Sequence, residues 1–261
     1  MKKIISVFVL LLSFVAFSQQ EKVEISYTSR LILPDDFTFQ PPVGGNGRTM
    51  SKEMQDQFKK NVQEPQQATL TILGDESLYK IIEKISNDQN QGMGMRGGGG
   101  MRMFSMNGDN IYKNTATHQL LKEQNMMGKE YVIKDSLRNF DWKLTRETKT
   151  ILGNEAKKAT TIIDSVQTTV WYIPSLKYKT GPEKFWGLPG LIAEVQTELN
   201  RGMLKGTRII TLTDIKTSTN TKPLDKPKEK NIITQKEYDK LMQEQRKKFE
   251  DMRNSGVNKR D

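Results

Sequence analysis

The sequence predicts a mainly β protein of the α+β class: a curved antiparallel sheet or half-barrel, with a short N-terminal helix and a covering C-terminal helix. Three observations carry this prediction. Segments that alternate apolar with polar residues recur along most of the chain. Turn residues separate these segments at intervals of about 8–12 residues, which is typical of consecutive hairpins rather than of βαβ units. Amphipathic helical patterns occur only towards the two ends.

The expected strands follow the runs of period-2 alternation, and most of them end at Gly, Asn, Asp or Pro. The hairpin across Gly74-Asp75 and the turn at Met127-Gly128 are two examples. The expected strands are 23–33, 68–73, 77–85, 111–125, 129–133, 142–151, 156–163, 166–173, 191–198 and 204–215.

Two helices complete the expected fold. From Ser51 to Val62, apolar residues recur every four positions, and Ser51 is a good N-cap. Near the other end, Thr234 and Glu237 stand at the spacing of a capping box, which predicts a helix over 234–252. Its apolar stripe is narrow, so we expect it to cover one end of the sheet rather than to bind a membrane.

The chain divides into segments of different composition. Residues 87–110 contain seven glycines and five methionines and predict a mobile insertion loop. The expected segments are a signal peptide over 1–18, the antiparallel β domain over 19–215 with its insertion at 87–110, a polar linker over 216–233, the helix over 234–252 and a disordered tail over 253–261.

The N-terminus predicts export. Lys2 and Lys3 precede an apolar run from Ile4 to Phe17, and small residues stand before a cleavage point after Ser18. The alternative, an uncleaved anchor, is disfavoured because the run is shorter than the roughly 20 residues that span a bilayer. We therefore expect a periplasmic or secreted protein with no transmembrane segment after cleavage.

Composition narrows the classes of function. The chain has no cysteine, which excludes disulfides, thiolate metal sites and a cysteine nucleophile. Removing two lysines with the signal peptide leaves 39 basic against 31 acidic residues, a net charge of +8. Such a surface could lie against anionic envelope components or an acidic partner. Much of the excess lies in 222–230 and in the C-terminal tail, however, where a solvated segment is the favoured interpretation. Nucleic acid is not an expected partner, because no binding motif is present in an exported chain.

The most informative motif is the hexapeptide Gly187-Leu188-Pro189-Gly190-Leu191-Ile192. Pro189 fixes one dihedral angle and favours an extended conformation at Leu188, while the two glycines permit positive φ or close backbone approach. The motif therefore predicts either a rigid buried loop between two strands or one wall of a cleft for a partner or an apolar ligand. The residues that would form this contact surface are Trp171, Phe185, Trp186, Gly187, Leu188, Pro189, Gly190, Leu191 and Ile192.

The stretch from Trp171-Tyr172-Ile173-Pro174 through Gly181-Pro182 to the hexapeptide resembles the GLPGLI family of exported Bacteroidota proteins, which is largely of unknown function. The resemblance covers roughly 142–215 and implies an exported, mostly β protein with no established catalytic residues. The strand pattern also looks somewhat like the half-barrel of periplasmic lipoprotein carriers.

Three functions follow as hypotheses. The first is non-enzymatic binding or scaffolding at the cell envelope, beside an outer-membrane transporter or another envelope protein. The second is a carrier of an apolar ligand in the half-barrel. The third is Cu(I) handling, because thioethers are soft ligands that select Cu(I). The residues for the third are Met93, Met95, Met101, Met103 and Met106. Enzymatic activity is not expected, since His118 is the only histidine and no catalytic motif accompanies it.

Overall fold

A computed structural model describes residues 21–37, 51–82, 110–126, 128–201, 204–219, 222–228 and 230–257. The predicted signal peptide over 1–18 and the five methionines of the Cu(I) hypothesis lie outside these residues. Of the predicted Gly/Met loop, only Asn110 lies among them. The predictions of export and of a copper site therefore stay predictions.

The fold is mainly β, as the sequence predicted. One sheet runs through the described residues, accompanied by two helices. The elements are β1 Lys22–Ile32, α1 Lys52–Gln63, β2 Gln66–Leu73, β3 Glu76–Ile81, β4 Ile111–Asn114, β5 Gln119–Met126, β6 Lys129–Ser136, β7 Lys143–Ile151, β8 Asn154–Ile163, β9 Val166–Ile173, β10 Leu191–Arg201, β11 Leu204–Ser218, β12 Ile232–Ile233 and α2 Gln235–Val257.

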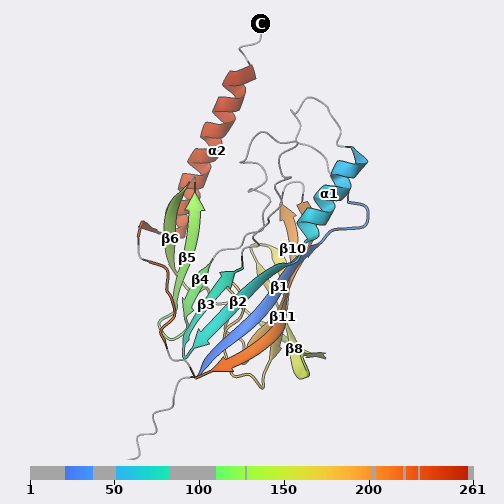
Figure 1. Ribbon diagram of the computed structural model, residues 1–261, viewed down its shortest axis with the longest axis vertical. Coiled ribbons are helices and arrows are strands. Elements are labelled where there is room, and N and C mark those ends of the chain that lie inside the picture. Colours follow the sequence, from blue (N-terminus) through green and yellow to red (C-terminus); the bar gives the residue numbers. More distant parts are fainter. Residues whose placement is uncertain are drawn as a thin grey trace, which may run out of the picture.

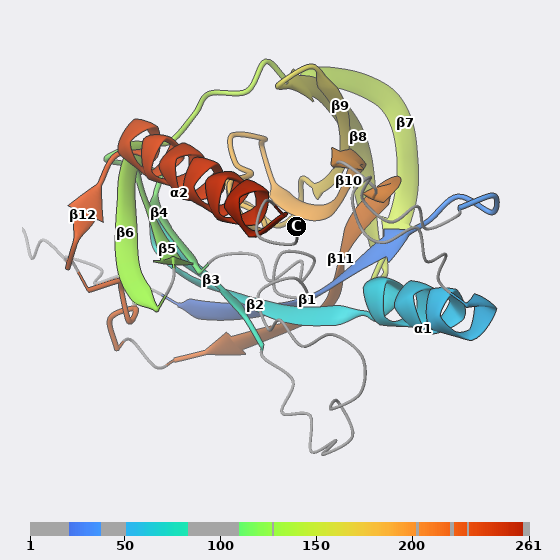
Figure 2. The ribbon, with the colours of Figure 1, turned by 90° about the horizontal axis from the view of Figure 1, so that it is seen from above.

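The sheet consists of two antiparallel meanders joined at their first and last strands. Strands β1 to β6 follow one another in space, strands β7 to β11 do the same, and β1 pairs with β11. The short β12 adds a parallel edge beside β6. The sheet curls into a bowl that stays open, and the connection from β6 to β7 crosses between its two sides (Figures 1 and 2). The right-handed twist of neighbouring strands produces such curvature.

The inner face of the bowl carries the main core. On β1, the alternation that the sequence shows places Val23, Ile25 and Tyr27 on this face, all buried. Residues of β2, β9, β10 and β11 continue the same cluster across both meanders. Because side chains alternate between the two faces of a strand, period-2 patterning determines which residues of each strand enter this core.

The predicted polar linker is partly structured. Residues 216–218 extend β11, and residues 232–233 form β12. Between them, Leu224 is buried against Leu78, Tyr112, Leu121 and Val132, and Lys226 lies over the ring of Tyr112. We call residues 222–228 the outer strap, since they cover the outer face of β3–β6. A single leucine in a polar run has no periodicity, which is why the pattern predicted a linker.

Both predicted helices are present. Ser51 precedes α1, which packs near the end of β1. Thr234 and Glu237 form the reciprocal hydrogen bonds of a capping box at the start of α2. Tyr238 donates to Gln124, and beyond this contact α2 runs on past the ends of β5 and β6 (Figure 1).

The helix α2 continues to Val257, so the predicted tail is wrong for residues 253–257. Among the described residues, neither helix has the length and apolar character needed to cross a membrane.

One predicted strand is two. The expected strand over 111–125 breaks at residues 115–118 into β4 and β5. The side chain of Asn114 accepts hydrogen bonds from the backbone N–H groups of Ala116 and Thr117, and His118 adopts a φ of 54°. Such an Asx turn needs neither Gly nor Pro, so no breaker residue marked it in the sequence.

Candidate functional site

The connection between β9 and β10 lies inside the bowl. We call residues 174–190 the plug, and Figure 2 shows them enclosed by the curve of the sheet. The backbone of the plug is pinned to the strand that follows it: the N–H groups of Leu191 and Ile192 donate to the carbonyls of Leu176 and Thr180. A long connection that returns to the inner face covers apolar surface that a shorter turn would leave exposed.

The hexapeptide forms the end of the plug and the start of β10. Leu188, Leu191 and Ile192 are each at most 1% exposed. A Cβ atom on Gly190 would lie 2.3 Å from the carbonyl oxygen of Ile173, so only glycine permits this approach of the two backbones. Of the two readings that the sequence left open, the rigid buried loop describes these residues.

Polar groups from two strands hold the plug, and a third strand holds the start of β10. Lys113 on β4 donates from Nζ to the carbonyl oxygens of Gly181 (2.6 Å) and Phe185 (3.0 Å). The hydroxyl of Ser77 on β3 pairs with that of Thr180 at 3.1 Å. The contact from β1 joins the first residues of β10, where Tyr27 donates to the carbonyl of Ile192 at 2.7 Å. The plug therefore links the two meanders across the bowl.

One charged pair borders these contacts. Arg208 on β11 binds Glu183 of the plug at 2.6 Å and donates to Ser29 at 3.1 Å. Burial lowers the pKa of Lys113 to about 7, and the nearby charge of Glu183 opposes that shift. Burial also raises the pKa of Tyr79, with a further contribution from Glu183.

One side of the plug reaches the surface at Trp186. Its Nε1 donates to the carbonyl of Arg138 at 2.8 Å, and its own carbonyl accepts from Nε1 of Trp142 at 3.0 Å. The ring of His118 lies 5.2 Å from that of Trp186, and Arg138 pairs with Asp164 at 3.0 Å. We call Trp186, His118, Arg138 and Asp164 the rim. It joins the plug to the β6–β7 connection and to the β4–β5 turn.

The structure separates the predicted contact residues into three groups. Phe185, Leu188, Gly190, Leu191 and Ile192 are buried and belong to the core rather than to a surface. Gly187 and Pro189 are exposed, and Trp171 and Trp186 are half-buried.

The two tryptophans have different surroundings. Trp171 lies on β9 under the ammonium of Lys149, which also binds Glu194. Trp186 contacts the rim. The expectation that both line one cleft finds no support in these contacts.

Sequence reasoning missed Lys113, Glu183 and Arg138. Lys113 stands two residues from Ile111, so period-2 alternation puts both on one face, and this was the available signal. No pattern in the sequence predicted the hydrogen bond between Nε1 of Trp186 and the carbonyl of Arg138, which are 48 residues apart.

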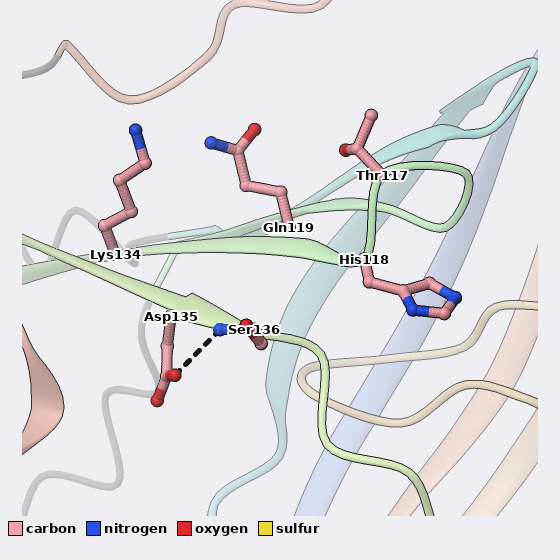
Figure 3. A pocket seen from close by; sticks show the side chains of 6 residues that line it. All are labelled: Thr117, His118, Gln119, Lys134, Asp135 and Ser136. Carbon is pink, nitrogen blue, oxygen red and sulfur yellow. Dashed lines mark hydrogen bonds between the residues drawn. The ribbon is translucent and has the colours of Figure 1, made fainter.

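A hollow of about 570 Å³ beside the rim is lined entirely by polar residues. Figure 3 shows that these side chains do not converge: Lys134, Gln119 and Thr117 extend on one side of the hairpin, and Asp135 on the other. Nucleophilic or acid–base catalysis needs groups within hydrogen-bond reach of one another. Among the described residues, no three His, Cys, Asp or Glu side chains group as a metal site would require.

Fold and site together define a class of protein: an open, curled antiparallel sheet whose inner face holds one of its own connections. The model of the family described as "N-glycanase peptide, N-terminal domain" matches residues 103–243, which include the plug and the rim, and the chain belongs to this family.

Solved structures of PNGF-II are similar to the chain. The structure in the C2 space group shows 20% identity and a TM-score of 0.45, and the match covers 78% of this chain and 28% of that one. The structure in the P21 space group shows 20% identity and a TM-score of 0.46, covering 82% and 31%. The chain thus spans less than a third of the length of these structures. No curated protein matches the sequence.

Proposed function

We propose that this chain is an exported, non-enzymatic binding or scaffolding module of the cell envelope, and that its rim contacts the partner. The observation that carries the proposal is the state of Trp186. Its ring stays half-exposed, while its Nε1 and its carbonyl are fixed by Arg138 and Trp142. An indole held in this way is ordered before a partner arrives.

Pre-ordering matters because binding normally immobilises side chains at a cost of about 0.5–1.5 kcal/mol each. Trp and Arg are also the residues that most often dominate protein–protein interfaces. The rim places one of each together with His118 and Asp164, so it offers an aromatic surface, donors and an acceptor within one small area.

The partner class that we favour is a polypeptide of the envelope, of which an outer-membrane transporter is one example. The family description associates this domain with N-glycanases, which makes a glycan-bearing polypeptide the first partner to test. The resemblance of the hexapeptide region to exported GLPGLI proteins supports the envelope location.

No observation favours the other two hypotheses, the carrier of an apolar ligand and the handling of Cu(I). An apolar ligand would have to occupy the inner face of the bowl, and the plug fills the part of that face on β3 and β4 to which Ser77 and Lys113 belong. The methionines of the Cu(I) hypothesis lie outside the described residues.

A pull-down from envelope extracts tests the proposal. Tagged residues 19–261 with Trp186→Ala should lose at least one partner that the wild type recovers. Trp171→Ala is the matched control, since it removes a half-buried tryptophan that contacts Lys149 rather than the rim, and it should keep the partner. Circular dichroism verifies that both variants fold. Identical partners for all three proteins would refute the rim as the contact surface.

A further inference from the structure

Lys113 is the one lysine among the described residues whose side chain is fully buried. It lies on β4 between Ser77 of β3 and Leu120 of β5, on the inner face. Its Nζ reaches the carbonyl of Phe185, which directly precedes Trp186, and the carbonyl of Gly181 at the other end of the same turn of the plug. A single amine therefore joins both ends of the turn that leads to the half-buried indole.

We propose that Lys113 is the positioning residue for Trp186 and that it makes the plug a pH-sensitive latch. Protonation of this buried amine favours the open state of the plug. The inference concerns the plug itself. It bears on partner binding only if the rim is the contact surface proposed above.

The geometry supports a latch because the acceptors of Lys113 are neutral. Both hydrogen bonds go to backbone carbonyls, and the nearest carboxylate, Glu183, is already bound to Arg208 at 2.6 Å. No salt bridge to Lys113 occurs among the described residues. A buried ammonium without an ion-pair partner is costly, whereas a neutral amine still donates two hydrogen bonds to the same oxygens.

The direction of the effect follows from linkage. The pKa of Lys113 is about 7 in the closed state, against 10.5 for a lysine in water. An open plug, with the amine solvated, therefore binds more protons than the closed plug throughout the window between these two values. The contribution of Lys113 to the stability of the closed plug is then fully present above pH 10.5, and it is lost as the pH falls towards about 7. Between pH 8 and pH 6 the opening equilibrium constant should rise about tenfold.

Other ionisable groups on the inner face could contribute to a pH response and must be separated from Lys113. Arg208 stays charged at all relevant pH values. Burial raises the pKa values of Tyr27 and Tyr79, so both phenols stay uncharged between pH 6 and pH 8. The other charged groups on these elements include Glu183 and Lys184 in the plug, Lys122 on β5 and Asp135 on β6. Desolvation lowers the pKa of Lys184 as well, and a variant that removes only Lys113 separates the two contributions.

Hydrogen exchange without any partner tests the latch. Protection factors are measured at pH 8 and pH 6 for the amides of Gly187, Leu191 and Ile192, which donate to carbonyls of the plug. In the wild type they should fall about tenfold on acidification. In Lys113→Met, which keeps a long apolar chain but no amine, the change should be less than about twofold. Amides of the β8–β9 hairpin serve as the internal reference.

A direct titration keeps the proposal testable if Lys113→Met does not fold. The ¹⁵Nζ resonance of Lys113 in the wild type should titrate with a midpoint of about 7, and His118→Gln should leave that midpoint unchanged. A midpoint near 10.5, or an equal pH response of plug protection in wild type and Lys113→Met, would overturn the latch. Neither measurement involves a partner, so loss of the proposed binding function would leave both results standing.

Discussion

The substitution Gly190→Ala isolates the structural role of the hexapeptide. The added Cβ would lie 2.3 Å from the carbonyl oxygen of Ile173, 2.7 Å from its carbonyl carbon and 2.9 Å from Cα of Pro174. All three atoms are backbone, so no side-chain rotation relieves the contact. An ordinary contact needs about 1 Å more, which must come from moving the start of β10 away from the end of β9.

The size of the effect can be estimated from the cost of overpacking. Forcing extra atoms into a packed core typically costs 1–3 kcal/mol, and a backbone collision belongs at the upper end, about 3 kcal/mol. For a chain of this size, each kcal/mol lowers Tm by about 2–4 °C, so Gly190→Ala should lower it by about 6–12 °C.

Thermal unfolding monitored by circular dichroism measures the shift. The control is Gly153→Ala, at a turn glycine with a φ of 74° and no atom within 4 Å of the added Cβ. There only the left-handed conformation is penalised, by about 1 kcal/mol. A Tm for Gly190→Ala within about 2 °C of the wild type would refute the argument that close backbone approach requires glycine at this position.

Two further predictions concern the segments that follow the sheet. Leu224→Ala should destabilise the protein by about 2–3 kcal/mol, because it removes the buried anchor of the outer strap; Met242→Ala, on the exposed side of α2, should stay within about 0.5 kcal/mol in the same urea titration. Equal midpoints for the two variants would show that the strap adds nothing to stability. Thr234→Ala should cost about 1 kcal/mol and speed hydrogen exchange in the first turn of α2, since it removes the acceptor for the N–H of Glu237. Unchanged exchange there would mean that the capping box does not hold the helix start.

Local patterns predicted the local structure well. The hairpin across Gly74-Asp75, the capping box at Thr234 and the bounds of β9 follow from neighbouring residues alone, and all are present. The predictions of a mainly β class and of a curved antiparallel sheet also rest on local patterns, and the sheet confirms both. Period-2 alternation fixes strands and their faces without reference to distant parts of the chain.

The errors and omissions arise where distant segments decide the outcome. Nothing local states that β1 pairs with β11, or that the chain passes from β6 at one side of the bowl to β7 at the other. The break after Asn114 depends on hydrogen bonds of its side chain, and a search of the sequence for Gly and Pro does not reveal them. The burial of Lys113 depends on carbonyls some 70 residues away, at sequence separations of 68 and 72. The sequence could therefore place Lys113 on the same face as Ile111, but it could not identify the partners of the amine.

The position of the plug explains why a short motif constrains so much of the fold. An open sheet must cover its inner face without a second sheet or a layer of helices. Here the chain covers β3 and β4 on both faces with its own connections: the plug contacts Ser77 and Lys113 inside, and the outer strap contacts Leu78 and Tyr112 outside.

The plug contributes Trp186 to the rim. Its attachment to β4 through Lys113 and to the β6–β7 connection through Trp186 means that the placement of the indole depends on both meanders at once. A mutation that separates the meanders should therefore disturb the rim even when it lies far from Trp186. Gly190→Ala tests this consequence as well, because moving β10 also moves the carbonyl of Ile192 that Tyr27 binds. A shift in the ¹H–¹⁵N resonance of the Trp186 indole, measured with all three tryptophans in place, would report the coupling. An unchanged resonance despite a lowered Tm would show that the rim is set by its local hydrogen bonds alone.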